Sequence, residues 1–369
     1  MQVTVADVMR AMDVIAPPHM AMEGDRIGLQ LGDPARPVAK LVVTLEVTPD
    51  VVDRAVAWGA DMIVAHHALL YRPLSEIRWD KPRQAMVAKL VAQQTAFFSA
   101  HTNLDCAPGG VNDVIVEKLG LSQPELLDVT GRDKLAKVVV FVPVSHVDAV
   151  RQALGDAGAG HIGAYSHCTF GTPGTGSFKP GPGTHPYIGE EGKLELVDEV
   201  RLETIAYERD LDRIVASMLK AHPYEEVAYD IYPLAVPGRP FGIGRIGTLP
   251  EPMELESFVD RVRRAFHLPH LRYAGCPRAS VQKIAVLGGS GSGWIPGALA
   301  RGADALVTAD VSHHQAADAV HDGLAIVDVP HAALEAPVCE AVARKLGEAL
   351  GLGVEVRVDV EGVDPWRFV

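Results

Sequence analysis

The chain has 369 residues, and this length suggests two domains or one domain with an insertion. Its formal net charge of −13 argues against nucleic-acid binding, which needs a basic surface, but still permits a small anionic ligand. No apolar run reaches the roughly 18 residues of a membrane span, and the N-terminus lacks the pattern of a secretory signal. The four cysteines form no C-x-x-C pair, so we expect a cytoplasmic protein without a disulfide framework.

The N-terminal part of the chain alternates between helical and strand-like patterns. Thr48 and Pro49 suit the cap and first turn of a helix that should stop near Gly59. The β-α-β-α-β order indicates a mostly parallel sheet, which binds ligands at the carboxyl ends of its strands. The predicted helices are 5–15, 48–59 and 82–94, and the predicted strands are 40–45, 61–65 and 95–100.

From about residue 134 the pattern changes to two successive β-α-β units, which suggest a ferredoxin-like domain. Residues 171–183 are rich in glycine and proline, and residues 237–242 are interpreted as the exit linker. The predicted strands are 136–143, 163–169, 200–206 and 226–232, and the predicted helices are 147–157 and 211–221.

After this region the alternation of helix and strand resumes. The simplest interpretation is an α/β domain built from residues 1–129 and 239–369, with an α+β domain inserted over 130–238. The C-terminal half contributes predicted strands 280–287, 305–308, 324–329 and 354–358 and a final helix over 335–350.

Histidines and carboxylates follow three of the predicted strands. Such polar groups are costly to bury unless a partner compensates for their lost hydration. A transition-metal centre would explain the polar residues after all three strands together. For a single block, a hydrogen-bonded structural histidine is the commoner explanation, but three blocks at strand ends favour a metal. The residues are His66 with His67, His101 with Asp105, and His331 with Glu335.

The spacing of these residues leaves the arrangement of the metal open. His66 and His67 serve one metal only if the backbone turns there, because consecutive strand residues face opposite ways; otherwise each serves its own metal. His331 and Glu335 project from one face if their segment is helical. The candidates exceed what one zinc ion needs, so two metals sharing a carboxylate would use them all, with His101 in a supporting position.

Three further segments carry weaker signals. The glycine run 288–293 follows a strand and either cradles an anion with its amides or is a plain strand-to-helix loop. It lacks the lysine of a P-loop. The segments 185–187 and 222–226, each containing His-Pro-Tyr, are interpreted as structural turns, with ligand binding as the less favoured alternative.

Taken together, the blocks resemble the Nif-three-like family of dinuclear-metal proteins, also called GTP cyclohydrolase I type 2 homologues. The resemblance runs from about residue 24 to residue 335 and covers most of the chain. The matching blocks are 28–32, 65–67, 101–105 with 109–113, Thr308-Ala309-Asp310 with His314, and His331 with Glu335.

The resemblance implies two divalent metal ions per chain, which are zinc, iron, manganese, cobalt or nickel. His67, Asp105 and Glu335 would hold one ion, and His66, His331 and Glu335 the other, with Glu335 bridging. It also implies a homohexamer, a toroidal trimer of dimers, and a PII/CutA-like insertion in which Tyr207 and 222–226 fit the pattern. Five residues beside the motifs depart from the family's usual ones: Glu46, Ala68, Ala309, Pro330 and Leu334.

We weigh three functions on this basis. The first is a metal-dependent hydrolase acting on a nucleotide or another phosphorylated small molecule, with His101, Asp310 or His314 moving protons. The second is a non-catalytic metal-binding hexamer that serves as a scaffold, metal chaperone or regulatory protein. The third is a protein-interaction adaptor whose metals are only structural.

Overall fold

The computed structural model describes residues 2–366, and these fold as two compact units. One unit runs up to Gly131 and resumes at Phe241, and the other is Arg132–Pro240. Both are mixtures of helices and sheets, which confirms the predicted α/β fold class. None of the helices within 2–366 is long and apolar enough to cross a membrane.

The first unit contains a five-stranded sheet in the order β1-β4-β3-β2-β15. Strands β2, β3, β4 and β15 are parallel, while β1 runs antiparallel to β4 at one edge. The opposite edge is the C-terminal strand β15, so both halves of the chain build this sheet. The bounds are β1 Gly28–Leu31, β2 Lys40–Thr44, β3 Met62–Ala65, β4 Ala96–Ser99 and β15 Glu355–Val358.

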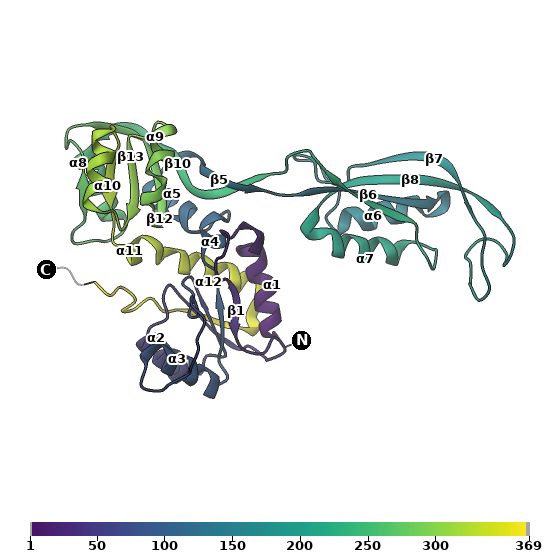
Figure 1. Cartoon of the computed structure of the whole chain (residues 1–369), viewed down its shortest axis with the longest axis horizontal. Coiled ribbons are helices and arrows are strands. Elements are labelled where there is room, and N and C mark those ends of the chain that lie inside the picture. Colours follow the sequence, from purple (N-terminus) through teal and green to yellow (C-terminus); the bar gives the residue numbers. More distant parts are fainter. Residues whose placement is uncertain (1, 367–369) are drawn as a thin grey trace. The chain divides into compact units, whose positions relative to one another are not determined.

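Helices cover both faces of this sheet (Figure 1). Side chains alternate between the faces: Val43 and Val64 join the core that includes α1 and α12, whereas Val42 and Ile63 join the core that includes α2 and α3. Thr48 caps α2 and Gly59 ends it with left-handed backbone, as predicted. The bounds are α1 Val5–Ile15, α2 Pro49–Trp58, α3 Pro82–Ala92 and α12 Pro337–Leu350.

A six-stranded sheet completes the first unit in the order β11-β14-β13-β12-β10-β5. Its central strands β12, β13 and β14 are parallel. The predicted linker 237–242 is wrong in its second half, because β10 begins at Pro240 and pairs with β12. The bounds are β5 Ser122–Arg132, β10 Pro240–Glu254, β11 Arg272–Ala274, β12 Ser280–Ser290, β13 Ala305–Ala309, β14 Ala325–Asp328, α8 Leu255–Ala265, α9 Ile295–Ala300 and α10 His313–His321.

One large core joins the two sheets of this unit. It contains Val64 and Phe98 from the first sheet, Val307 and Val327 from the second, and residues of the helices between them. The carboxyl ends of β3, β4, β13 and β14 therefore lead toward a common region. Three short or medium helices continue from there: α4 Thr102–Cys106, α5 Val111–Leu119 and α11 His331–Glu335.

The second unit has the order β-α-β-β-α-β and an antiparallel sheet arranged β7-β8-β6-β9, which is the ferredoxin-like connectivity. Its helices α6 and α7 cover one face of the sheet (Figure 1). The predicted strand 163–169 is misplaced: β7 starts at Thr169 and continues into the glycine-rich stretch, where β8 pairs with it. The bounds are β6 Leu135–Pro143, α6 Val147–Asp156, β7 Thr169–Phe178, β8 Glu195–Tyr207, α7 Leu211–Ala221 and β9 Tyr229–Leu234.

Candidate metal centre

His66 and His67 follow β3 directly, where the backbone bends, and their amides donate to the carbonyls of Thr44, the last residue of β2, and of Leu45. The Nδ1 of His66 donates to the carbonyl of Ala100 at 2.8 Å, and the Nδ1 of His67 donates to Glu46 Oε2 at 2.7 Å. These bonds fix each ring and leave both Nε2 atoms for other partners.

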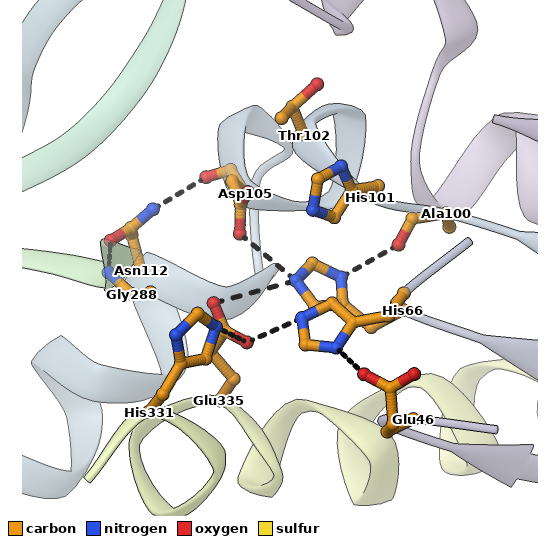
Figure 2. A network of polar contacts seen from close by, with 12 residues as sticks. Glu46, His66, Ala100, His101, Thr102, Asp105, Asn112, Gly288, His331 and Glu335 are labelled. Atoms are coloured by element: carbon orange, nitrogen blue, oxygen red, sulfur yellow. Dashed lines mark hydrogen bonds and ion pairs between the residues drawn. The ribbon is translucent and has the colours of Figure 1, made fainter. Parts of the chain in front are cut away.

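The carboxylate of Glu335 lies at the centre of the histidines. Its Oε2 is 3.1 Å from His67 Nε2 and 3.0 Å from His331 Nε2, and its Oε1 is 3.8 Å from His66 Nε2. His331 and Glu335 lie on one turn, helix α11, so they share a face as predicted. Figure 2 shows Glu335 between His66 and His331. One carboxylate thus reaches three imidazoles.

Asp105, on α4, completes the buried side of the cluster. Its Oδ1 lies 3.7 Å from His66 Nε2, and neither atom has a hydrogen-bond partner although both are fully buried. An unsatisfied buried polar atom costs about 1–3 kcal/mol, so two that face each other need a compensating group. A metal ion between imidazole nitrogen and carboxylate oxygen satisfies both.

His331 is oriented by Asp310, the residue directly after β13. Its Nδ1 donates to Asp310 Oδ2 at 2.6 Å, and Asp310 adopts left-handed backbone with a φ of 57° directly after β13. Aspartate tolerates this conformation better than most residues. Asp310, predicted to move protons, therefore acts on His331 as an orienting group in this geometry.

The charges of the cluster depend strongly on one another. Although burial opposes it, hydrogen bonds to Glu335 and Glu46 raise the pKa of His67 to about 10, and hydrogen bonding to Glu335 raises the pKa of His331 to about 9. Burial raises the pKa of Asp105 to about 6. Burial would also raise the pKa of Glu335, but its histidine partners hold it well below the usual range. Without a metal, the histidines of the cluster therefore hold protons that metal binding would displace.

The ligand atoms form two groups that share Glu335. His66, Asp105 and Glu335 make a fully buried group, and His67, His331 and Glu335 make a second, less buried one. Glu335 belongs to both groups, as its expected bridging role requires. Asp105 lies with His66 in this geometry, whereas the resemblance assigns it to the ion held by His67, and the division of ligands between two ions stays a prediction.

Two further predicted residues lie at different distances from the centre. The ring of His101 is 5.2 Å from that of His66, and a third group joins His66, His67 and His101. His314 lies exposed on α10, where its ring contacts His313, and none of the groups found among residues 2–366 includes it.

The glycine run 288–293 makes room for the centre. A Cβ on Gly289 would lie 2.5 Å from Glu335 Oε1, and its backbone is left-handed with a φ of 69°. The amide of Gly288 donates to Asn112 Oδ1 and that of Gly291 to Thr308 Oγ1. Two amides of the proposed anion cradle are therefore already engaged within the fold.

Two carboxylates that orient histidine rings of the cluster have no clear signal in the sequence. Glu46 differs there only as a departure from the family pattern, yet it orients His67. Asp25 accepts hydrogen bonds from His101 Nδ1 at 2.9 Å and from the amide of Thr102. Although burial opposes it, hydrogen bonds from His101 and Thr102 hold the pKa of Asp25 below its usual range. No local pattern marks Asp25, which lies 76 residues from His101.

The Duf34/NIF3 (NGG1p interacting factor 3) family matches residues 3–364. The chain belongs to the NIF3 family. Among its relatives, proteins named GTP cyclohydrolase 1 type 2 homolog are 45% identical in Halalkalibacterium halodurans, over 96% of both chains, and 43% identical in Bacillus subtilis, over 98% of both chains.

Solved structures with similar sequences share the fold. A Bacillus cereus protein related to NIF3 is 42% identical and superposes with a TM-score of 0.91, with complete coverage of both chains. A Staphylococcus aureus protein is 25% identical with a TM-score of 0.76, covering 100% of this chain and 99% of its own. The whole fold, both compact units included, thus has counterparts among known proteins.

Proposed function

We propose that this NIF3 protein binds two divalent metal ions that share Glu335 and that it hydrolyses a nucleotide or another phosphorylated small molecule. The observation that carries the metal sites is the pair of buried, unsatisfied atoms, His66 Nε2 and Asp105 Oδ1, beside that carboxylate. Imidazole and carboxylate ligands suit zinc, iron, manganese, cobalt or nickel. Two such ions would supply Lewis-acid activation of a substrate oxygen and of water.

The chain's own residues would prepare the site for this chemistry. Glu46, Asp310 and the carbonyl of Ala100 hold the three ligand imidazoles by their Nδ1 atoms, so each Nε2 is presented to a metal. His101 donates its Nδ1 proton to Asp25, which leaves its Nε2 free to accept a proton from a reacting group.

A pocket beside the centre favours an anionic substrate. It has a volume of about 500 Å³ and is lined by His331, Asp310 and Arg272, among others. Arg272 pairs with Asp328 and donates to the carbonyl of Val311, while 72% of its side chain stays exposed. Its guanidinium offers a positive charge to a phosphate beside the metal ligands. The names of the relatives support a nucleotide such as GTP.

The assembly and the setting of the protein are also proposals. The family resemblance supports a homohexamer, and a molar mass six times that of the chain in light scattering is the expected result. The lack of cysteine pairing patterns and the bacterial relatives support a cytoplasmic location.

A substrate screen tests the hydrolase. Protein loaded with each of the five metals is incubated with GTP and with aryl phosphate mono- and diesters, beside Glu335→Ala and the exposed control Glu340→Ala. We expect metal-dependent turnover that Glu335→Ala abolishes and Glu340→Ala retains. Metal-loaded protein that leaves every compound unchanged would overturn the hydrolase and favour the metal-binding scaffold.

A further inference from the structure

A second pocket lies within the ferredoxin-like unit, far along the chain from the metal ligands. It has a volume of about 440 Å³, in the range that accommodates small organic ligands. Phe178, Tyr187 and Tyr224 contribute aromatic walls, and Glu199 lies among the lining residues. Neither the proposed metal centre nor the hydrolase uses this pocket.

The carboxylate of Glu199 forms a buried polar floor. Only 8% of the residue is exposed, and its Oε1 accepts a hydrogen bond from the hydroxyl of Tyr224 at 3.0 Å. No donor among residues 2–366 reaches Oε2. A Cβ on Gly176 would lie 2.1 Å from Oε2, so a larger residue there would press on this oxygen. The carboxylate keeps acceptor capacity for a ligand.

The His-Pro-Tyr segments build the pocket. His222 Nε2 donates to the carbonyl of Phe141 at 3.0 Å, so its Nδ1 accepts from the amide of Tyr224 at 3.1 Å. Burial lowers the pKa of His222, which keeps the ring neutral in this role. Glu225 accepts from the amide of His185 at 3.0 Å. Segments interpreted from sequence as separate turns are thus linked around one cavity.

The chemistry of the lining favours a cation. Its charged residues are Glu199, Glu225 and Glu226 against a single lysine, Lys179. The ring of Tyr224 lies 6.4 Å from that of Tyr187, and aromatic faces attract flat cations. A carboxylate pairs best with planar groups that present two parallel N–H donors.

We propose that this pocket binds a small organic cation whose amidinium or guanidinium group pairs with Glu199 beside the rings of Tyr187 and Tyr224. The inference is independent of the metal centre. The alternative is that Glu199 only stabilises Tyr224 and that the cavity binds nothing selectively.

Binding of benzamidine to the full chain, measured by calorimetry or ligand-observed NMR, tests the proposal. Benzamide and benzoate are the neutral and anionic counterparts of similar shape. We expect saturable binding of benzamidine and affinities at least about tenfold lower for the other two. Glu199→Gln should weaken benzamidine binding by about tenfold or more, and Tyr187→Leu several-fold.

Tyr165→Leu is the matched control, since Tyr165 is exposed in the same unit and does not line the pocket. It should bind benzamidine as the unaltered chain does. Absence of saturable binding, a preference for benzoate, or full affinity in a folded Glu199→Gln would overturn the proposal. If Glu199→Gln does not fold, Tyr187→Leu decides: undiminished affinity overturns the proposal, and weakened affinity supports it. Metal content, measured on the same samples, should be unchanged throughout.

Discussion

Glu46 acts on the proposed metal centre through a single hydrogen bond to His67. In Glu46→Gln the side chain keeps its size but loses the charge that orients and polarises the imidazole. We expect metal affinity to fall by about 10–100-fold, mainly at the less buried group that contains His67 and His331. Competition with a chelator of known affinity measures the change. Glu340→Gln, an exposed carboxylate on α12, should behave as the unaltered chain; an equal loss in both variants would contradict the assigned role.

The variant Gly289→Ala tests whether Glu335 needs the open space beside Gly289. In Gly289→Ala the new Cβ would meet Glu335 Oε1 and would also strain a left-handed backbone, so we expect loss of metal and a free energy of unfolding lower by about 1–3 kcal/mol. Gly293→Ala is the control in the same run, because nothing lies within 4 Å of its Cβ position. Chemical denaturation and metal analysis of both variants give the comparison. Metal retained by Gly289→Ala would show that Glu335 does not need this space.

At the scale of single residues, the sequence predicted which residues would be metal ligands but not which of them would lie together. The strand ends placed His66, His67, Asp105 and Glu335 together, because a parallel sheet brings its carboxyl ends to one edge. Which of two adjacent histidines shares Asp105 depends on the direction of each ring. That direction is set by the Nδ1 acceptors Ala100 and Glu46, and pairings this distant leave no local pattern.

The C-terminal strand β15 is held in the first sheet partly by an ion pair between the half-buried Arg54 and the buried Asp359. Arg54 of α2 donates two hydrogen bonds of 2.8 Å to Asp359, directly after β15, and one to the carbonyl of Glu361. Arg54→Ala leaves the buried Asp359 without this partner and should lower the free energy of unfolding by about 1–3 kcal/mol. Arg83→Ala, an exposed arginine on α3, should change it little.

The ion pair between Arg54 and Asp359 predicts that the free energy of unfolding depends on pH. Although burial opposes it, the hydrogen bond from Arg54 lowers the pKa of Asp359, so the folded state favours the ionised carboxylate. Its contribution is present above the ordinary aspartate pKa of about 4 and is lost as the pH falls through the lower, folded-state value. The difference in unfolding free energy between the unaltered chain and Arg54→Ala should therefore shrink in acid. A difference that stays constant from neutral to acid pH would contradict the pairing.

The elements differed in how well sequence predicted them. Apolar spacing predicted α1, and the cap Thr48 with the stop at Gly59 predicted α2, because those signals are local. The sequence predicts no strand in the glycine-rich stretch after residue 170, yet β7 pairs with β8 along its whole length, and tertiary pairing overrides propensity there. The predicted final helix 335–350 begins two residues later, at Pro337, because Glu335 ends the separate helix α11 and Pro337, which has no amide hydrogen, starts α12.

At the scale of the whole molecule, the centre joins distant parts of one unit. Its ligands follow β3 and β4 near the start of the chain and β14 near its end, so bound metal would tie both halves of the first unit together. Metal at a thousandfold excess over its dissociation constant stabilises the folded state by about 4 kcal/mol. We expect chelation to lower one thermal transition, that of the first unit, and to leave the transition of residues 132–240 in place. Calorimetry that shows both transitions moving together, or neither, would contradict this division.

The shared carboxylate of Glu335 is the central claim, and metal content per chain tests it most directly. Elemental mass spectrometry of reconstituted, untagged protein is compared with Glu335→Ala and with the exposed control Glu340→Ala. The account predicts about two metal ions per chain in the unaltered protein and in the control, and loss of most of both in Glu335→Ala. No bound metal after reconstitution, or full retention in Glu335→Ala, would contradict it.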